Sequence, residues 1–389
     1  MYDIVIKNGS VIDFEQNIVH QKKDLYIRDG IFIEPDHGSG KYESRHVLDA
    51  VGCIVTPGLV DTHFHAFEGG NYIGAIYPDI ICPPNGITTV IDAGTAGTLN
   101  FKALYYDCVT KSRTEVKALL HPAALGVLWP TMEEPENPDE FDIRRIKSLF
   151  GEYEKTLVGL KIRCNAECTA GFGTSPIKKA VEIADYLNDE GHKCRVTMHF
   201  GQVEDCVTVD DMADCLRAGD VFAHFYQPCK DQTFDEHGRM RKGIIRAKER
   251  GVLFDACMAS SHYSFENIRI IMREGFMPDI ISSDMVSRIA YYKPCFSLPY
   301  LLSLFLNEGM SLEEIFKAVT YTPAKAFGIL GNAGTLKPGT RADVAIFKIK
   351  EQHMRVVDRF GGYSDIERLI VPMATVNNGM VVFQQLFFD

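Results

Sequence analysis

Short apolar runs alternate with helix-like stretches along most of the chain. Between residues 54 and 333, eight runs rich in β-branched and aromatic residues are separated by segments whose apolar positions recur at helical spacing. The eight runs are IVTPGLVDTHFH, GITTVIDAG, VKALLHPAALGV, LVGLKIRC, CRVTMHF, DVFAHFY, GVLFDAC and DIISSDM. A regular βα series of this size predicts an α/β fold, a (β/α)8 barrel of the TIM type.

The two ends of the chain have a different pattern. DIVIKNGSVIDF, DLYIRDGIFIE and ATVNNGMVVF each place Asn-Gly or Asp-Gly between short runs of Val, Ile and Phe, which is typical of β-hairpins. Because such short strands bury little surface alone, both ends are expected to form one small β-sandwich. The predicted organisation is a first sandwich segment at residues 1–53, the barrel at 54–333 and a second sandwich segment at 334–389.

Helix ends are marked at three places. Ser175 is expected to cap the helix SPIKKAVEIADYLNDEG, with Pro176 at its first position. Ser311 and Glu314 have the spacing of a capping box. Further on, Thr322-Pro323 begins another helix, which Gly328 can end.

Composition narrows the class of protein. The 389 residues carry a net charge of −11 without a long basic run, which argues against a nucleic-acid or anionic membrane surface. No run of about 18 apolar residues occurs, so no membrane span is expected. Asp3 and Lys7 interrupt what would be the core of a signal peptide, and eleven scattered cysteines fit reduced thiols. A cytoplasmic protein is expected.

Polar residues gather where the predicted strands end, the end of a barrel that carries its active site. The first strand ends in His63-Phe64-His65, and side chains two residues apart on a strand face the same way, so both imidazoles can bind one metal. The fourth strand holds Lys161 in an apolar run, where a lysine must be paired or chemically modified.

Three further strands end in candidate ligands. The fifth and sixth end in His199 and His224, and the eighth ends in Asp284. Each residue alone could be a hydrogen-bonded core residue. Together with the first and fourth strands, however, they favour a metal centre built from His63, His65, Lys161, His199, His224 and Asp284.

This combination resembles the amidohydrolase superfamily, in the subgroup with two metals bridged by a carbamylated lysine. PGLVDTHFH, GLKIR, the later strand-end histidines, Asp284 and NAGTLKPGTRADVAIF carry the resemblance, which runs over nearly the whole chain. The stretch from GVLFDAC to DIISSDM is similar to deacetylase-like members often labelled dihydroorotase or adenine deaminase. Those members usually have Gly-His-Gly after strand seven, whereas this chain has Ala256-Cys257-Met258.

The resemblance implies roles for these residues. His63, His65 and Asp284 would bind one divalent metal and His199 and His224 the other, with a CO2-derived carbamate on Lys161 bridging both. Zinc is the first choice for this ligand set. A metal-bridging hydroxide would attack the carbonyl, and Asp284 would act as the catalytic base and then as the acid.

Substrate contacts are assigned to two residues. Arg163 lies on the same strand face as Lys161 and could bind a substrate carboxylate, or it forms an ion pair at the barrel rim. His262 could bind the leaving group. The loop at residues 66–86 covers the site or pads the barrel top, and the single Trp129 is expected to pack under a loop. His121 has no partner at a suggestive spacing.

The leading hypothesis is hydrolysis of an amide or ester bond in a small acylated acid or amine. The alternative is a cyclic amide hydrolase of the dihydroorotase type. Dihydroorotases normally have an arginine two residues after the second histidine, and this chain has Phe67 there, which argues against dihydroorotase itself. Nucleobase deamination is the third and less favoured alternative. Deaminases of this fold have a glutamate shortly after the histidine of strand five, whereas here Phe200-Gly201-Gln202 follows His199. A non-enzymatic scaffold is disfavoured, because a scaffold does not need the six candidate metal ligands that this chain has. The expected partner is a small-molecule substrate, and the oligomeric state stays open, since barrels of this kind often pair.

Overall fold

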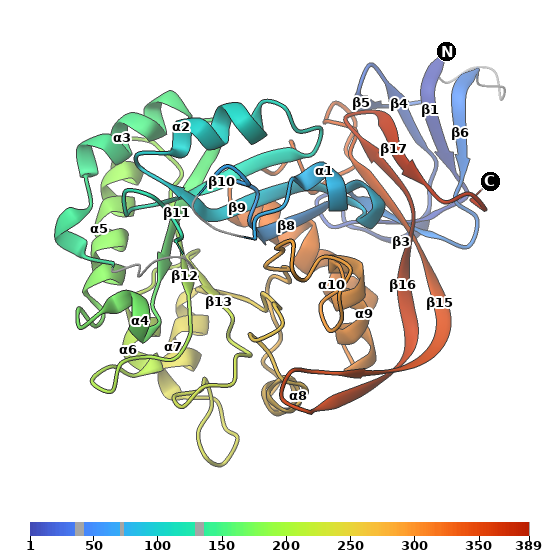
Figure 1. The fold of residues 1–389 in the computed structure, drawn as a ribbon. Coiled ribbons are helices and arrows are strands. Elements are labelled where there is room, and N and C mark those ends of the chain that lie inside the picture. The colour runs from blue at the N-terminus through green and yellow to red at the C-terminus, as the bar shows by residue number, and fades with distance from the viewer. Residues whose placement is uncertain (36–42, 71–73, 129–135, 389) are drawn as a thin grey trace.

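A curled parallel sheet forms the centre of the molecule (Figure 1). The computed structural model describes residues 1–35, 43–70, 74–128 and 136–388. The seven strands of this sheet run in the order β14-β13-β12-β11-β10-β9-β8, so neighbours in the sheet are also neighbours in sequence. They are β8 (Leu59–Phe64), β9 (Ile87–Gly97), β10 (Glu115–His121), β11 (Leu157–Arg163), β12 (Arg195–His199), β13 (Val221–Ala223) and β14 (Leu253–Asp255). The predicted α/β barrel is confirmed.

Residues 280–285 close the barrel between its first and last strands. Ile280 forms a parallel bridge with Asp255, and Met285 forms one with Phe64. The predicted strand DIISSDM is wrong as a continuous strand, because only these two of its residues form bridges. Its backbone instead donates to a side chain, since the Ser283 N–H binds the Asp61 carboxylate at 3.0 Å.

Two buried carboxylates tie this segment to the rest of the barrel. Asp61 on β8 accepts the Ser283 Oγ–H at 2.5 Å, in addition to the backbone N–H. Asp255 on β14 accepts the hydroxyl of Ser282 at 2.7 Å and that of Thr62 at 3.1 Å. Both aspartates are almost fully buried, so each bond satisfies a group that water does not reach.

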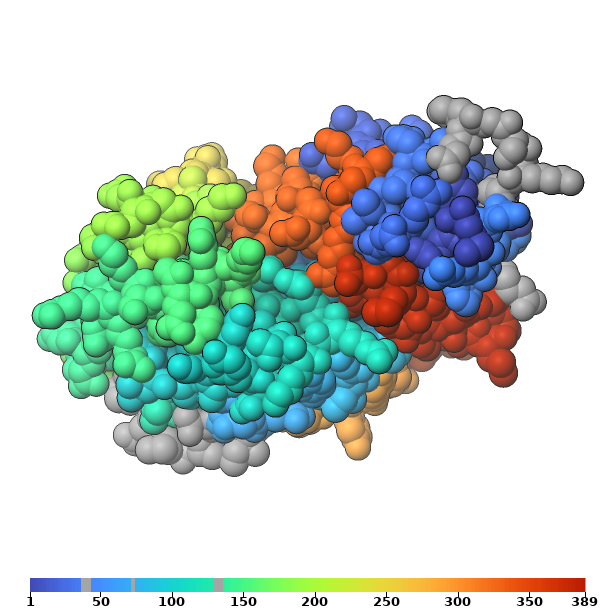
Figure 2. Space-filling model, turned by 90° about the horizontal axis from the view of Figure 1, so that it is seen from above, coloured from blue at the N-terminus to red at the C-terminus, as the bar shows by residue number. Residues whose placement is uncertain are grey.

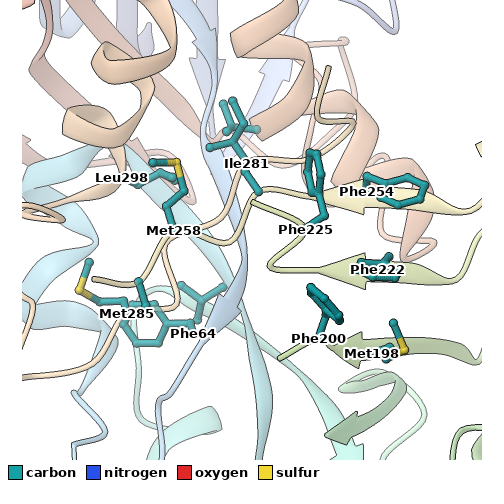
Figure 3. Close-up of a cluster of buried hydrophobic side chains, with 14 of the residues drawn as sticks. Phe64, Met198, Phe200, Phe222, Phe225, Phe254, Met258, Ile281, Met285 and Leu298 are labelled. Atoms are coloured by element: carbon teal, nitrogen blue, oxygen red, sulfur yellow. The ribbon is translucent and has the colours of Figure 1, made fainter. Parts of the chain in front are cut away.

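Alternation along the strands decides which side chains face the barrel interior. Met198 and Phe200 flank His199 and pack outward with Phe222 and Phe254 from the neighbouring strands (Figure 3). The rings of Phe222 and Phe254 stack with centroids 5.3 Å apart. Because successive strand residues point to opposite faces, this apolar packing directs His199 inward.

Helices cover the outside of the sheet (Figure 1). The α-helices are α1 (Pro78–Ile81), α2 (Phe101–Leu104), α3 (Ile143–Glu152), α4 (Ala166–Thr169), α5 (Ser175–Asp189), α6 (Val209–Asp214), α7 (Lys242–Arg250), α8 (Phe265–Arg273), α9 (Leu298–Asn307), α10 (Leu312–Val319) and α11 (Tyr321–Ala326). Short helical turns of other types are η1 (Pro83–Asn85), η2 (Tyr105–Val109) and η3 (Pro138–Glu140). Among the described residues, no helix combines the length and apolarity needed to cross a bilayer.

The helix ends follow the sequence with two exceptions, the start of α5 and the start of α11, which begins at Tyr321 and not at Thr322-Pro323. The capping box of Ser311 and Glu314 is confirmed, with both reciprocal bonds formed at the start of α10. Gly328 follows α11 with a φ of +67°, as expected of a residue that ends a helix. At α5 the cap is Thr174, and the predicted Ser175 is the first helical residue; no side-chain bond marks this end.

Both chain ends build the second lobe, seen together in Figure 2 as the blue and red atoms. Its four-stranded sheet has the order β5-β4-β1-β6 and its six-stranded sheet the order β17-β16-β15-β7-β2-β3. The strands are β1 (Tyr2–Lys7), β2 (Ser10–Asp13), β3 (Ile18–Lys22), β4 (Leu25–Arg28), β5 (Ile31–Ile33), β6 (Ser44–Asp49), β7 (Ile54–Pro57), β15 (Val344–Val357), β16 (Tyr363–Asn377) and β17 (Met380–Gln384). The core between them includes Ile4, Ile27, Val344 and Met373.

The run IVTPGLVDTHFH does not form the single strand predicted. It divides at Gly58 into β7, which pairs with β15 and β2 in the second lobe, and β8 in the barrel. At Gly58 the chain passes so close to Thr88 that an added Cβ would lie 2.1 Å from its Oγ1. The domain limits at residues 53 and 333 stay a prediction.

A long hairpin reaches from the second lobe back over the barrel helices (Figure 1). It consists of β15 and β16, and β16 lies along α9, where the Asn307 amide donates to the Arg368 carbonyl at 2.8 Å and accepts the Glu367 N–H at 2.8 Å. At the hairpin tip, Asp358 accepts the N–H of Phe265, the first residue of α8, at 2.8 Å. The hairpin therefore holds two barrel helices in place.

Replacing Ser283 by alanine removes the hydroxyl that donates to Asp61. We expect the free energy of unfolding to fall by about 1–3 kcal/mol, because one buried carboxylate oxygen loses its donor. The measurement is a urea unfolding curve. Ser287→Ala is the matched control, since Ser287 is exposed and its hydroxyl forms no described hydrogen bond. An equal loss in both variants would show that the Asp61 bond contributes little to barrel closure.

Candidate active site

The eight residues singled out from the sequence meet at the carboxyl end of the barrel. His63, His65, Lys161, Arg163, His199, His262 and Asp284 line one pocket of about 100 Å3, together with Val127, Ser261 and Arg288. His224 packs behind them, with its ring centroid 4.3 Å from His199 and 4.0 Å from His262. A larger cavity of about 650 Å3 lies at the opposite end of the barrel, near Lys117 and Arg341, away from these histidines.

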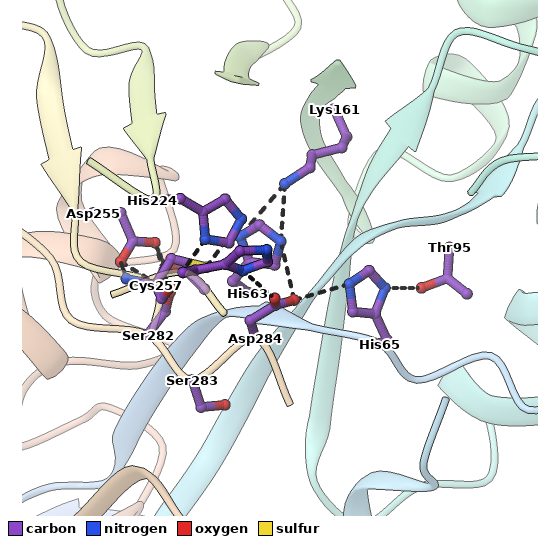
Figure 4. Close-up of polar contacts among 12 residues, drawn as sticks. His63, His65, Thr95, Lys161, His224, Asp255, Cys257, Ser282, Ser283 and Asp284 are labelled. Atoms are coloured by element: carbon purple, nitrogen blue, oxygen red, sulfur yellow. Dashed lines mark hydrogen bonds and ion pairs between the residues drawn. The ribbon is translucent and has the colours of Figure 1, made fainter. Parts of the chain in front are cut away.

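His63, His65 and Asp284 form the first group of potential metal ligands, with their ligand atoms within 4.8 Å of one another. Asp284 Oδ1 lies 3.1 Å from His65 Nε2 and 3.5 Å from His63 Nε2 (Figure 4). The other nitrogen of His65 contacts Thr95 Oγ1 at 2.9 Å, which orients the ring. The end of β8 and the closing segment thus bring their polar side chains together.

His199, His224 and His262 form the second group, again within 4.8 Å. The Nδ1–H of His224 donates to the Cys257 carbonyl at 2.8 Å, which leaves Nε2 to face the pocket. His262 Nδ1 lies 3.1 Å from Asp284 Oδ2, so this histidine connects the second group to the first. His262 therefore lies among the potential ligands, whereas the sequence pointed to it only as a substrate contact.

Lys161 lies between the two groups. Its side chain is 1% exposed, and Nζ is 2.9 Å from His63 Nε2. Gly94 on β9 makes room for it, because a Cβ at Gly94, where φ is +78°, would lie 2.6 Å from the Cβ of Lys161. Burial lowers the pKa of the Lys161 amine to about 8.

Burial also sets the protonation of the other groups. It lowers the pKa of His63, His199 and His224 well below the usual value, which favours the neutral ring with a lone pair for a cation. Burial alone would raise the pKa of Asp284. The neighbouring His63, His262 and His65 outweigh it and hold that pKa well below its usual range.

A buried acid supports the strand that carries Arg163. Glu136 Oε1 accepts the Arg163 backbone N–H at 3.0 Å and lies 3.0 Å from His121 Nε2. His121 Nδ1 accepts the Ala123 N–H, so Nε2 carries the proton toward Glu136. No spacing in the sequence pointed to this pair, because the partner of His121 comes from a loop and not from a neighbouring strand position.

Sequence reasoning assigned no role to Arg288, Glu136 or Cys257. Arg288 follows Asp284 by four residues and lines the pocket, a placement that the loop conformation alone decides. Of the segment 66–86, residues 71–73 lie outside the described ranges, and Phe67 is buried. Trp129 also lies outside the described residues.

The chain is similar in sequence and in fold to known enzymes. The chain is 28% identical over 330 residues to a deacetylase of Agrobacterium fabrum, which covers 85% of this chain and 79% of the relative. It is 27% identical over 383 residues to a deacetylase of Enterococcus faecalis, covering 98% and 99%. A crystal structure of an adenine deaminase is similar with a TM-score of 0.88 and 25% identity, over 99% of this chain and 100% of that one.

The match at family level covers most of the sequence. Residues 54–381 match the amidohydrolase family, a span that includes the whole barrel and most of the returning chain end. Its relatives are hydrolases, in agreement with a pocket in which histidines surround the ionised carboxylate of Asp284. The resemblance seen in the sequence is confirmed: this chain is an enzyme and belongs to the amidohydrolase family.

Proposed function

We propose that this enzyme hydrolyses an amide or ester bond of a small acylated acid or amine, as a deacetylase. The observation that carries the proposal is the position of Asp284, whose two oxygens contact His65 on one side and His262 on the other. A single ionised carboxylate thus stands where the two groups of imidazoles meet. The two relatives named deacetylase, at 28% and 27% identity, support the acyl substrate.

The donor set suits two divalent cations. His63, His65 and Asp284 would hold one, His199 and His224 the other, with Lys161 as its carbamate between them. Neutral imidazoles and a carboxylate are ligands that zinc accepts, and zinc remains the first choice. Bound cations would lower the pKa of a water molecule and polarise the scissile carbonyl.

The environment of Lys161 supports the carbamate. Only the neutral amine reacts with CO2, forming an N–C bond and releasing one proton. With a pKa of about 8, about a tenth of the amine is neutral at pH 7, against roughly one in 3,000 for an ordinary lysine. Burial among imidazoles therefore favours the modification chemically.

Asp284 is positioned to move the proton. As an ionised group it can accept a proton from the attacking water at one oxygen and donate it to the leaving nitrogen or oxygen. The water oxygen forms the new bond to the acyl carbon, and the bond to the leaving group breaks. The products are a carboxylic acid and an amine or alcohol.

Pocket size and charge suggest the substrate class. A volume of about 100 Å3 suits a small acyl group, and the guanidinium groups of Arg163 and Arg288 both line it. Guanidinium groups bind carboxylates in a two-pronged way. A substrate with one carboxylate and a small acyl group fits this lining, with His262 near the leaving group.

A substrate screen tests the proposal directly. The metal-loaded enzyme is assayed with N-acetyl and O-acetyl acids beside hydantoins, dihydroorotate and adenine, which represent the alternative cyclic amide hydrolase and deaminase. Turnover of acetylated acids alone is the expected result. Preferred turnover of dihydroorotate or adenine would overturn the deacetylase assignment.

Asp284→Asn keeps the size of the side chain and removes its basicity. We expect kcat to fall by about 10²- to 10⁴-fold, since proton transfer contributes that much, while metal analysis still finds much of the metal. Asp189→Asn, at the exposed end of α5, is the control and should leave kcat unchanged. Wild-type turnover in Asp284→Asn would rule out this proton carrier.

Gly94→Ala tests the space beside Lys161. The added methyl group collides with the lysine, so we expect metal content and kcat to fall together and the free energy of unfolding to drop by more than the roughly 1–2 kcal/mol of a left-handed backbone penalty. Gly275→Ala is the matched control, with a φ of +75° and no atom within 4 Å of its Cβ. Equal metal content in both variants would contradict the role of Lys161.

Arg288→Gln tests recognition of a substrate carboxylate. A hydrogen bond to a charged group contributes about 1.5–3 kcal/mol. Its loss should raise the KM for acetylated acids about 10- to 100-fold and change kcat less. The KM for a neutral acetylated amide should change little. The exposed Arg144→Gln is the control, and an equal KM change for charged and neutral substrates would argue against carboxylate binding.

A further inference from the structure

Three consecutive strand ends adopt the same uncommon backbone conformation. His224 after β13, Cys257 after β14 and Asp284 in the closing segment have φ values of 69°, 41° and 49°. Residues other than glycine rarely adopt positive φ, and such residues gather at functional sites. Cys257, just beyond the end of β14, thus shares this backbone conformation with two of the potential metal ligands.

The thiol of Cys257 lies within reach of a cation shared with histidines. Its Sγ, His63 and His224 form a third group of ligand atoms within 4.8 Å of one another. All three side chains are at most 1% exposed. Cys257 is the one cysteine found in such a group among the residues that the structure describes.

The spacing of Cys257 and His224 is that of two ligands on one metal. Sγ is 3.7 Å from His224 Nε2, the nitrogen left available because Nδ1 donates to the carbonyl of Cys257 itself. For tetrahedral zinc, with Zn–S of about 2.3 Å and Zn–N of about 2.0 Å, ligand sulfur and nitrogen lie about 3.5 Å apart. The backbone carbonyl of Cys257 therefore orients the imidazole of His224, and the sulfur of Cys257 lies beside the other nitrogen of that ring.

We propose that Cys257 is a metal ligand of this enzyme, binding the cation held by His224 on the side that faces His63. The proposal rests on the metal centre of the proposed function and adds a sulfur ligand to it. On binding, the S–H proton is released to solvent and a metal–sulfur bond forms, with no change of oxidation state. Because thiolates prefer zinc to manganese or magnesium, the enzyme should retain zinc in the presence of excess manganese.

X-ray absorption of the zinc-loaded enzyme tests the sulfur directly. We expect a scattering shell at about 2.3 Å from sulfur, beside nitrogen and oxygen at about 2.0 Å. Zinc surrounded by nitrogen and oxygen alone would overturn the proposal and leave the proposed function standing. A folded protein that binds no zinc, even with bicarbonate present, would overturn both.

Cobalt-loaded variants identify which cysteine is responsible. The wild-type enzyme should show the near-ultraviolet thiolate-to-cobalt charge-transfer band, and Cys257→Ser should lose it. Cys194→Ser is the matched control, because Cys194 is equally buried but immediately precedes β12, at the barrel end opposite His199, so its band should persist. A band that survives in Cys257→Ser overturns the proposal. If Cys257→Ser fails to fold, the zinc spectrum of the wild-type enzyme still decides.

Discussion

Closure of the barrel by residues 280–285 is the constraint on which the site depends. This segment has too few bridges to hold itself between β14 and β8, and two buried carboxylates supply the missing bonds. Asp61 lies two residues before His63, which lines the pocket, and Asp255 lies two residues before Cys257, which is buried beside His63 and His224. The bonds that close the barrel therefore also help to position these side chains, and Asp284 belongs to the closing segment itself.

Burial shifts the protonation of the groups that these strand ends bring together. Removal from solvent moves several basic groups toward the neutral form: it holds the pKa of His63, His199 and His224 well below the usual value and lowers that of Lys161 to about 8. Asp284 is the exception, because its neighbours compensate for its burial. Asp284 thus brings a negative charge into a pocket that Arg163 and Arg288 also line.

The strand-end residues could be predicted because a two-residue period and a βα rhythm are local signals. Residue spacing alone places His63 and His65 on the same face of a strand, and Met198 and His199 on opposite faces, without any knowledge of the fold. Other features depend on contacts between distant segments. Glu136 reaches His121 from a loop, the closing segment replaces backbone pairing with side-chain bonds, and the division at Gly58 depends on Thr88. No pattern within a short stretch of sequence encodes these.

The shared second lobe has a consequence for synthesis on the ribosome. Asp13 accepts hydrogen bonds from Thr335 and Leu336, more than 320 residues later, and β7 needs β15 as its neighbour. The edge of β7 therefore stays unpaired until β15, about 290 residues later, has been made, a situation that slows folding and exposes the nascent chain to aggregation. Joining the two termini and opening the chain elsewhere would bring these partners out of the ribosome together.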